Sequence, residues 1–379
     1  MNLTLANALF AAMAERVPVL LWGMPGIGKT ALVEAVARQQ NLLLEPLILS
    51  HHEPADLTGL PVANSEGTQV TRAPADWAQR LVSAVDQGYD GAVLFLDELS
   101  TAPPAVQAAA LQCVNERRVG NISLPDHVVV VAAANPPEIA AAGWDLAAPL
   151  ANRFCHLDVE PDPEMWARGL VEGWDTITPV PTAGDVTAGA YAGARAAVAS
   201  YIKAHPTVLL DVPVDVDSQG YGWPSPRSWE RLARLVARLP EGDNAARFAL
   251  AKGMIGEGAA VEFVTWLDNA DLPSPEALLA DPSAFDWNGE RLDKVHVALD
   301  AVTALAAAKG TKTAWDQASK VLAACCDAGR ADVALPAAQA LWRTRPDGVT
   351  SPPKAFSSFK GVLDPAGYSL AADPGREAA

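Results

Sequence analysis

A glycine-rich stretch that ends in lysine and threonine, GMPGIGKT at residues 23–30, has the spacing of a phosphate-binding loop. Small residues let backbone N–H groups wrap around phosphate oxygens, the lysine ammonium reaches the outer phosphates, and the threonine hydroxyl binds magnesium. Thr30 is therefore a predicted magnesium ligand, and the predicted phosphate-binding residues are Gly23, Met24, Pro25, Gly26, Ile27, Gly28, Lys29, Thr30 and Ala31. The alternative is a glycine-rich turn without a ligand.

Two adjacent carboxylates, Asp97 and Glu98, end the apolar run VLFLDE. Parallel strands place their carboxyl ends along one edge of a sheet, the edge at which the phosphate loop also lies. We expect Asp97 to hold Mg2+ and Glu98 to orient or deprotonate the water that attacks the terminal phosphate. The alternative is a solvated acidic strand end followed by a turn.

A further apolar run, HVVVVAAAN, ends in Asn135. A neutral amide at the same edge can hold the attacking water against the γ-phosphate without adding charge repulsion. The alternative is an ordinary turn asparagine before two prolines. With the loop and the carboxylates, Asn135 predicts a site that binds and hydrolyses ATP with Mg2+.

The elements that must position these residues are strands and helices that alternate up to about residue 160. Near-continuous apolar runs of this kind are typical of a parallel sheet that is covered on both faces. After that point the strand signal fades and the sequence predicts mainly helices. The expected strands lie within residues 17–22, 42–50, 91–98, 127–135 and 155–159.

Composition narrows the class of protein. The chain has 379 residues, a formal net charge of −17 and no Lys/Arg-rich run, so nucleic acid is an unlikely partner and a protein partner is favoured. No stretch of about twenty apolar residues predicts a membrane span, and the apolar N-terminal stretch has no basic region before it. Four cysteines without metal-ligand spacing predict buried, reduced thiols. We therefore expect a cytoplasmic protein.

Five motifs resemble those of the AAA+ ATPases in order and spacing. They are the phosphate loop, FLDE, the strand that ends in asparagine, LANRF at residues 150–154 and WPSPRSWERL at residues 223–232. Among the AAA+ ATPases, these motifs resemble those of the MoxR-like group, which has an insert in its second helix. The resemblance covers roughly residues 5–240 and implies an α/β fold: an αβα phosphate-loop core with a parallel five-stranded sheet, followed by an α-helical lid and a helical C-terminal extension. The expected boundaries are 1–160, 161–270 and 271–379.

The resemblance also implies roles for single residues. Lys29 and Thr30 match Walker A, Asp97 and Glu98 match Walker B, and Asn135 matches sensor 1. Arg153 matches the arginine finger, which in this family acts on ATP held by a neighbouring subunit, and Arg227 matches sensor 2. Two departures stand out: Asn152 occupies a position where the family often has Asp, and LST at residues 99–101 replaces the commoner INR.

The two arginines also have interpretations without the family. Ser225 and Pro226 predict the start of a helix, so Arg227 lies in its first turn, where the helix dipole disfavours a cation unless an anion is near. The alternative is an arginine that faces solvent. For Arg153 the alternative is a salt bridge to a local acid such as Asp158.

Two segments predict β-hairpins beside the core, LPVANSEGTQVTRA at residues 60–73 and RRVGNISLPDHV at residues 117–128. MoxR-like proteins carry a hairpin insert at the first position, facing the pore of the ring. The expectation is that both hairpins contact substrate, and the alternative is loops that only cap the sheet.

The predicted function is that of a MoxR-like AAA+ ATPase in a homo-oligomeric ring, expected to be a hexamer with the arginine finger acting in trans. The ring would remodel, mature or activate a protein client, and the family implies a client or adaptor with a von Willebrand A-type domain. One alternative is a gas-vesicle or metal- or cofactor-insertion ATPase of the same superfamily. Others are a monomeric small-molecule kinase or nucleotide switch, and a scaffold with a vestigial site.

Overall fold

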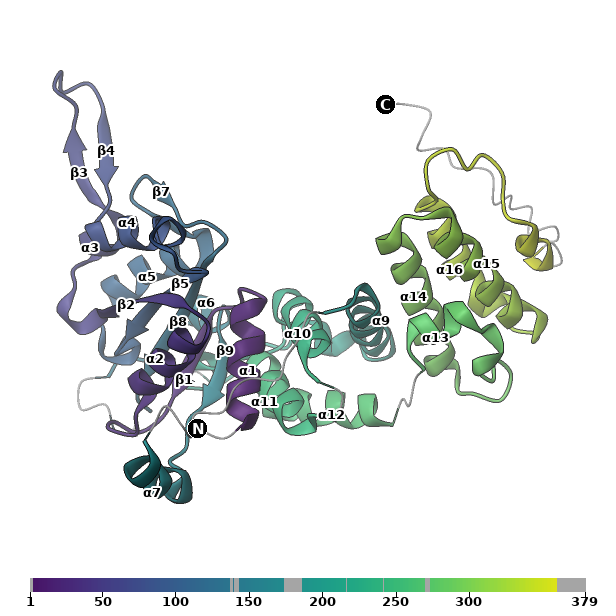
Figure 1. The fold of residues 1–379 in the computed structure, drawn as a ribbon, viewed down its shortest axis with the longest axis horizontal. Helices are drawn as coiled ribbons and strands as arrows, with labels where there is room; N and C mark the ends of the chain where they lie inside the picture. The colour runs from purple at the N-terminus through teal and green to yellow at the C-terminus, as the bar shows by residue number, and fades with distance from the viewer. Residues whose placement is uncertain are drawn as a thin grey trace. The chain divides into compact units, whose positions relative to one another are not determined.

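The computed structural model describes residues 3–136, 139, 143–173, 186–215, 217–240, 242–269 and 273–359 (Figure 1). The chain divides into two compact units. The first unit comprises residues 1–184 and 208–264, and the second comprises residues 185–207 and 265–379. Each unit is described separately below.

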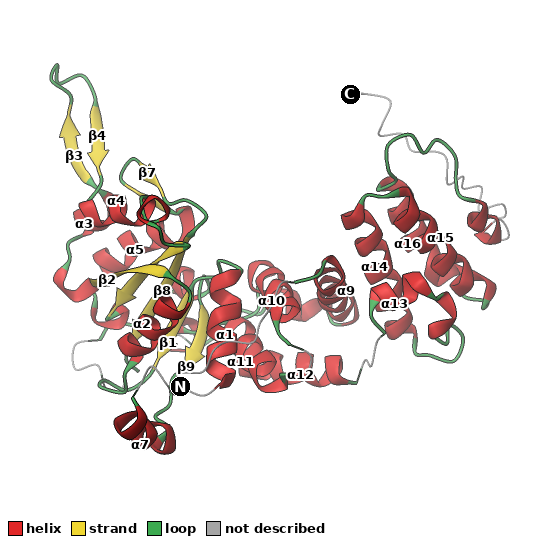
Figure 2. Ribbon diagram, in the orientation of Figure 1, coloured by secondary structure: helices red, strands yellow, loops and turns green. Residues whose placement is uncertain are grey.

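A parallel five-stranded sheet forms the centre of the first unit, with the strand order β2-β5-β8-β1-β9 (Figure 2). The expected strands are all present, and they are β1 (Val19–Trp22), β2 (Leu42–Ile48), β5 (Gly91–Asp97), β8 (Val128–Ala134) and β9 (Cys155–Asp158). The register pairs Trp22 with Ala134, and Ile48 with Asp97. This register brings the residues that follow β1, β2, β5 and β8 to one edge of the sheet.

Helices cover both faces of this sheet, because alternate residues of each buried strand point to opposite sides. The side chains on one face of the sheet, which include Leu20, Leu94 and Val130, share an apolar core with α4, α5 and α6. On the other side, α1 packs against β1, β8 and β9, and α2 packs against β2, β5 and β8. The helices are α1 (Leu3–Ala14), α2 (Lys29–Gln39), α3 (Pro54–Thr58), α4 (Asp76–Val82), α5 (Pro104–Glu116) and α6 (Ala148–Ala151).

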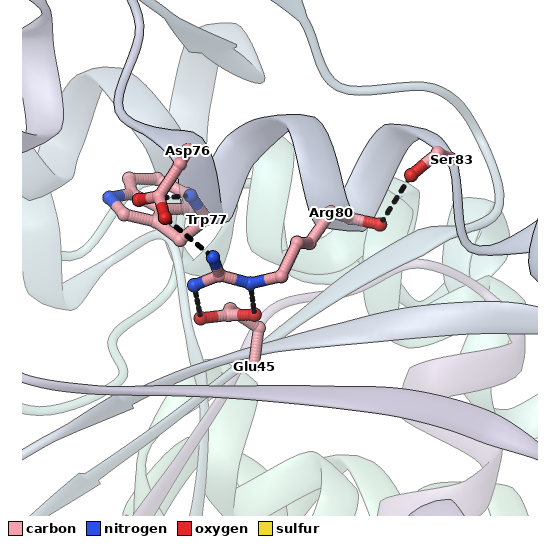
Figure 3. Close-up of polar contacts among 5 residues, drawn as sticks. All are labelled: Glu45, Asp76, Trp77, Arg80 and Ser83. Atoms are coloured by element: carbon pink, nitrogen blue, oxygen red, sulfur yellow. Dashed lines mark hydrogen bonds and ion pairs between the residues drawn. The ribbon is translucent and has the colours of Figure 1, made fainter.

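An ion-pair cluster fixes α4 to the edge strand β2 (Figure 3). The guanidinium of Arg80 forms two hydrogen bonds with the nearly buried carboxylate of Glu45, at 2.7 and 2.8 Å, and a third with Asp76 at 2.7 Å. A forked pair of this kind is directional. It therefore fixes where α4 begins, directly after the first hairpin.

Both predicted hairpins are present. The first pairs β3 (Leu60–Ala63) with β4 (Val70–Ala73), and the second pairs β6 (Arg118–Val119) with β7 (Ile122–Ser123). The turn of the second hairpin lies against the base of the first, where the peptide N–H of Asn121 donates to the carbonyl of Arg72 at 3.1 Å. Every residue of β3 and β4 is exposed, and this hairpin projects away from the sheet (Figure 2).

Four helices after β9 lie wholly or partly in the first unit. They are α7 (Pro163–Glu172), α10 (Pro226–Arg238), α11 (Asn244–Ile255) and α12 (Glu257–Asp268), and the division between the units falls within α12. Of these, α10 and α11 pack on α1, and α11 also packs on β9. Arg238 pairs with the buried Glu15, the residue after α1, at 2.7 Å, and Lys252 pairs with Asp158 of β9 at 3.1 Å. At the closest approach, a Cβ on Gly253 of α11 would lie 2.2 Å from the carbonyl oxygen of His156.

The second unit is helical. Its elements are α9 (Ala188–Ala204), α13 (Pro275–Ala280), α14 (Leu292–Lys309), α15 (Lys312–Asp327), α16 (Ala331–Arg343) and a final 3-10 segment (Lys354–Phe359). The packing of α9 against α14 includes Ala196, Ala197, Val297 and Ala301. All four cysteines of the chain are free and buried, as predicted.

This division differs from the expected boundaries in two places. Helix α9, expected within the lid, belongs to the second unit because its small-residue face packs on α14. The second unit resumes at residue 265, within α12, rather than at the expected boundary of 271, and its core includes Leu278, Phe285 and Trp287.

The contact at Gly253 gives a test of how the lid helices are held. Gly253→Ala places a methyl group against backbone atoms that cannot rotate away, so we expect a loss of about 1–3 kcal/mol of stability. Gly258→Ala in α12 is the matched control, because its Cβ meets no atom within 4 Å and alanine favours a helix by up to about 1 kcal/mol. Thermal unfolding of both variants checks this. Equal midpoints would contradict the close packing of α11 on β9.

Candidate nucleotide-binding site

The loop between β1 and α2 has the backbone of a phosphate cradle. Gly26 and Gly28 have φ of 79° and 91°, a left-handed conformation that side chains other than glycine rarely adopt. A Cβ on Gly23 would lie 2.7 Å from the carbonyl oxygen of Val159. Helix α2 starts at Lys29 directly after the loop, so its N-terminus, where anions are favoured, adjoins it.

The ammonium group of Lys29 lies inside this loop. It donates to the carbonyl oxygens of Gly23 at 2.6 Å and Met24 at 3.1 Å, and to Oδ1 of Asn135 at 2.9 Å. Burial lowers its pKa, and the nearby charge of Asp97 acts in the opposite direction. Lys29 thus links the loop after β1 with the residue after β8.

The predicted metal ligands also meet. The hydroxyl of Thr30 donates to Oδ2 of Asp97 at 3.0 Å, so the first turn of α2 contacts the end of β5. The other carboxylate oxygen of Asp97 accepts the peptide N–H of Glu98 at 2.9 Å. Glu98 has φ of 59°, an uncommon conformation for a residue with a side chain.

Two serines that the sequence analysis missed hold this edge. Ser50, which follows β2, donates its hydroxyl to Oε2 of Glu98 at 2.5 Å. Ser100 is buried; its hydroxyl donates to the carbonyl of Asn135 at 3.1 Å and accepts the peptide N–H of Asn135 at 3.2 Å. Ser100 is the middle residue of LST, so the departure from INR has a local structural role. Both serines follow strands of the sheet, which is the signal that would have identified them.

Arg153 lies two residues before β9 and is anchored by residues of the same chain. Its Nε donates to Oδ1 of Asn115 on α5 at 2.7 Å, and its Nη1 bonds to the carbonyl of Pro149. Asp158, the acid considered as an alternative partner, instead pairs with Lys252. The salt-bridge alternative for Arg153 is therefore wrong.

Arg227 lies in the first turn of α10, as predicted. Ser225 is the N-cap and accepts the peptide N–H of Ser228, and Pro226 is the first helical residue. The side chain of Arg227 is exposed, and no hydrogen bond or ion pair joins it to another residue of the described chain. Its charge lowers the pKa of Arg153, after the larger effect of burial.

Arg231, one turn further along α10, completes a group of like charges. Burial and then the charge of Arg227 lower its pKa to about 10, and Arg153 adds to the effect. Its Nη1 donates to the carbonyl of Arg153 at 2.5 Å. Within the described ranges, neither Arg153 nor Arg227 is hydrogen-bonded to the loop, the carboxylates or Asn135. The predicted site residues thus form two groups.

A buried histidine connects the strand before the loop with the segment before Arg153. Nδ1 of His156 accepts Nε1–H of Trp22 at 2.8 Å, so Nε2 carries the proton and donates to the carbonyl of Ala151 at 2.9 Å. Burial lowers the pKa of His156 to about 4, outweighing the hydrogen bond to Ala151 and the charge of Asp158. The imidazole is therefore neutral in the folded protein.

Comparison with known families identifies this arrangement. Residues 18–154, from β1 to the segment that carries Arg153, match the family model for the AAA domain of the dynein-related subfamily. The chain carries an AAA+ ATPase domain. The match confirms the AAA+ assignment made from the order of the motifs for this domain.

Individual relatives match part of this chain. Midasin of Dictyostelium discoideum is 28% identical over 172 residues, which are 42% of this chain and 3% of midasin. The uncharacterized protein YeaC of Bacillus subtilis is 28% identical over 137 residues, 34% of this chain and 38% of YeaC. The chain thus spans well under two thirds of either relative.

A solved structure of a proposed ATPase from Cytophaga hutchinsonii aligns with 71% of this chain and 89% of its own, with 17% identity and a TM-score of 0.44. Across the described residues, we find no helix with the length and apolarity needed to cross a membrane.

The pKa of His156 predicts a pH dependence of stability. Between about pH 6.5 and 4 the unfolded chain binds a proton that the folded imidazole does not, so stability falls as pH falls, by up to about 1.4 kcal/mol per pH unit. His156→Asn removes this dependence. Urea unfolding across that range should show the stability difference between wild type and variant shrinking as pH falls. A stability difference that stays constant across this pH range would rule out the neutral buried imidazole.

Proposed function

We propose that this chain is a MoxR-like AAA+ ATPase that acts in a homo-oligomeric ring and uses MgATP hydrolysis to remodel, mature or activate a protein client. The observation that carries the proposal is the separation of the candidate residues into two groups. Lys29, Thr30, Asp97 and Asn135 form a cradle within one subunit, whereas Arg153 and Arg227 are held apart from it as a pair of cations.

The cradle fits a nucleotide triphosphate with Mg2+. Gly26 and Gly28 supply backbone N–H groups, Lys29 supplies a cation, and Thr30 and Asp97 offer oxygen ligands whose atoms lie 3.0 Å apart. Bound Mg2+ would neutralise charge that develops on the phosphates during transfer. In this site Thr30 and Asp97 would hold the metal ion.

Hydrolysis needs a water directed at the terminal phosphate. Ser50 fixes Oε2 of Glu98, which leaves Oε1 to orient the water and accept its proton. Asn135, held through its backbone by Ser100, offers an amide to the same water. The contact of Asn135 with Lys29 supports this placement, because it puts the amide beside the cation that binds the outer phosphates.

The arginines serve the ATP of a neighbouring copy. The guanidinium groups of Arg153 and Arg227 repel each other unless an anion lies near, and a phosphate is the anion that the cradle of another subunit would present. A monomeric kinase or switch has no use for Arg153 and Arg227. The ring follows from this division, with six subunits as the expected number.

The client is proposed to be a protein, with a von Willebrand A-type domain in the client or an adaptor. The exposed β3–β4 hairpin, with Leu60, Val62 and Val70 all largely exposed, is the proposed contact, together with the adjoining β6–β7 hairpin. A gas-vesicle or cofactor-insertion ATPase would differ only in its client. We further propose that α10 and α11 act as the lid, and Arg227 as its sensor.

A mixing experiment tests the shared site. Arg153→Ala should bind ATP normally, because the cradle is intact, but lose about 10³–10⁵-fold in turnover. Glu98→Gln should also bind ATP and hydrolyse it slowly. When both are mixed, about one quarter of the interfaces combine an intact Glu98 with an intact Arg153, so steady-state turnover should reappear.

The matched control is a mixture of Glu98→Gln with Asp97→Asn, in which every cradle is defective and no recovery is expected. Co-purification of two differently tagged variants establishes that mixed particles form. Mixed particles of Arg153→Ala and Glu98→Gln that stay inactive, or full turnover by Arg153→Ala alone, would refute the shared site.

A further inference from the structure

Three polar side chains are buried where the segment before Arg153 meets the start of α10. Asn152 is 5% exposed, Ser225 is 7% exposed and Ser228 is fully buried. Nδ2 of Asn152 donates to the carbonyl of Trp223 at 2.8 Å, and its Oδ1 accepts the hydroxyl of Ser225 at 2.8 Å. The two segments that contain Arg153 and Arg227 are therefore joined directly through one amide.

Only an amide satisfies both of these contacts. The amide Nδ2 donates to the carbonyl of Trp223, which also accepts from Ser228, and Oδ1 of the same side chain accepts the hydroxyl of Ser225. A carboxylate at position 152 would keep the second contact but face the Trp223 carbonyl with a negative charge. The aspartate that the family often has here would therefore not reproduce this junction.

The junction is completed by Ser228 and Arg231. Ser228 donates its hydroxyl to the carbonyl of Trp223 at 3.0 Å and accepts the peptide N–H of Ser225 at 2.7 Å. Arg231 donates to the carbonyl of Arg153 at 2.5 Å. Buried polar networks whose members are all bonded are rigid. The first two turns of α10 and the peptide of Arg153 are thus fixed to each other.

We propose that Asn152 is a positioning residue that latches α10 to the segment before Arg153, so that Arg153 and Arg227 act as one rigid pair on a single phosphate group. The inference rests on the proposed shared site, which it deepens. The latch acts against the repulsion of the two guanidinium groups, whose charges lie close enough for Arg227 to lower the pKa of Arg153. Without the latch, that repulsion would drive the two side chains apart.

Asn152→Asp tests the latch with almost no change in volume. We expect kcat for ATP hydrolysis to fall about 10- to 100-fold, the range that misplacement of a catalytic group causes. The KM for ATP should change much less, because the cradle belongs to the same subunit and does not include Asn152. An unchanged kcat would overturn the proposal.

A double-mutant cycle supplies a readout that general destabilisation would not produce. Arg153→Lys and Arg227→Lys keep the charge but lose the forked donor, so both variants retain measurable activity. In the wild-type background their combined loss in kcat should be clearly smaller than the product of the single losses, because the pair works as a unit. With Asn152→Asp the two losses should multiply independently. The same coupling in both backgrounds would overturn the proposal.

Ser225→Ala and Ser274→Ala form a matched pair, since each removes the serine N-cap of a helix that begins with proline. Both should lose thermal stability, Ser225→Ala more so because it also leaves the buried Oδ1 of Asn152 without its hydroxyl donor, but only Ser225→Ala should lower kcat. Equal kcat values would count against the latch.

The mixture of Arg153→Ala and Glu98→Gln separates the two proposals. If that mixture regains turnover while the variants at Asn152 and Ser225 leave kcat unchanged, the latch is refuted and the shared site stands. If the mixture does not regain turnover, the shared site fails.

Discussion

The parallel register of one five-stranded sheet places the residues of the cradle. Trp22 pairs with Ala134, so the phosphate loop and Asn135 leave the sheet at the same level, and Ile48 pairs with Asp97, so Ser50 emerges beside Glu98. A shift of one residue in either pair would turn the side chains to the opposite face. The contacts of Lys29 and Thr30 then follow from strands that are fixed by burial.

The arginines depend on a different constraint, the docking of the lid helices on β9 and α1. Glycine at position 253 lets α11 approach the backbone of His156, and His156 in turn bonds to Trp22 and to the carbonyl of Ala151. One side chain thus connects the strand that leads into the phosphate loop with the turn that leads to Arg153. The same subunit therefore holds both its cradle and its arginine pair on a continuous, well-packed framework.

Much of this arrangement could be predicted from the sequence because its signals are local. Apolar runs that end in polar residues predicted the five strands, and SPRSW predicted the N-cap and first turn of α10. The partners of Asn152, Ser50 and Ser100 could not be predicted, because each bond joins segments brought together by tertiary packing. The place of α9 was missed for the same reason: its partner α14 lies about a hundred residues further along, and an alanine-rich helix matches many surfaces.

The dependence of turnover on protein concentration tests the central claim most directly. ATP hydrolysis per subunit is measured on dilution, with the particle mass determined in parallel by light scattering. If two copies share each site, turnover per subunit falls in step with dissociation, while the separated subunits still bind ATP. Subunits that remain monomeric with saturating ATP and hydrolyse it at the full rate would contradict the account.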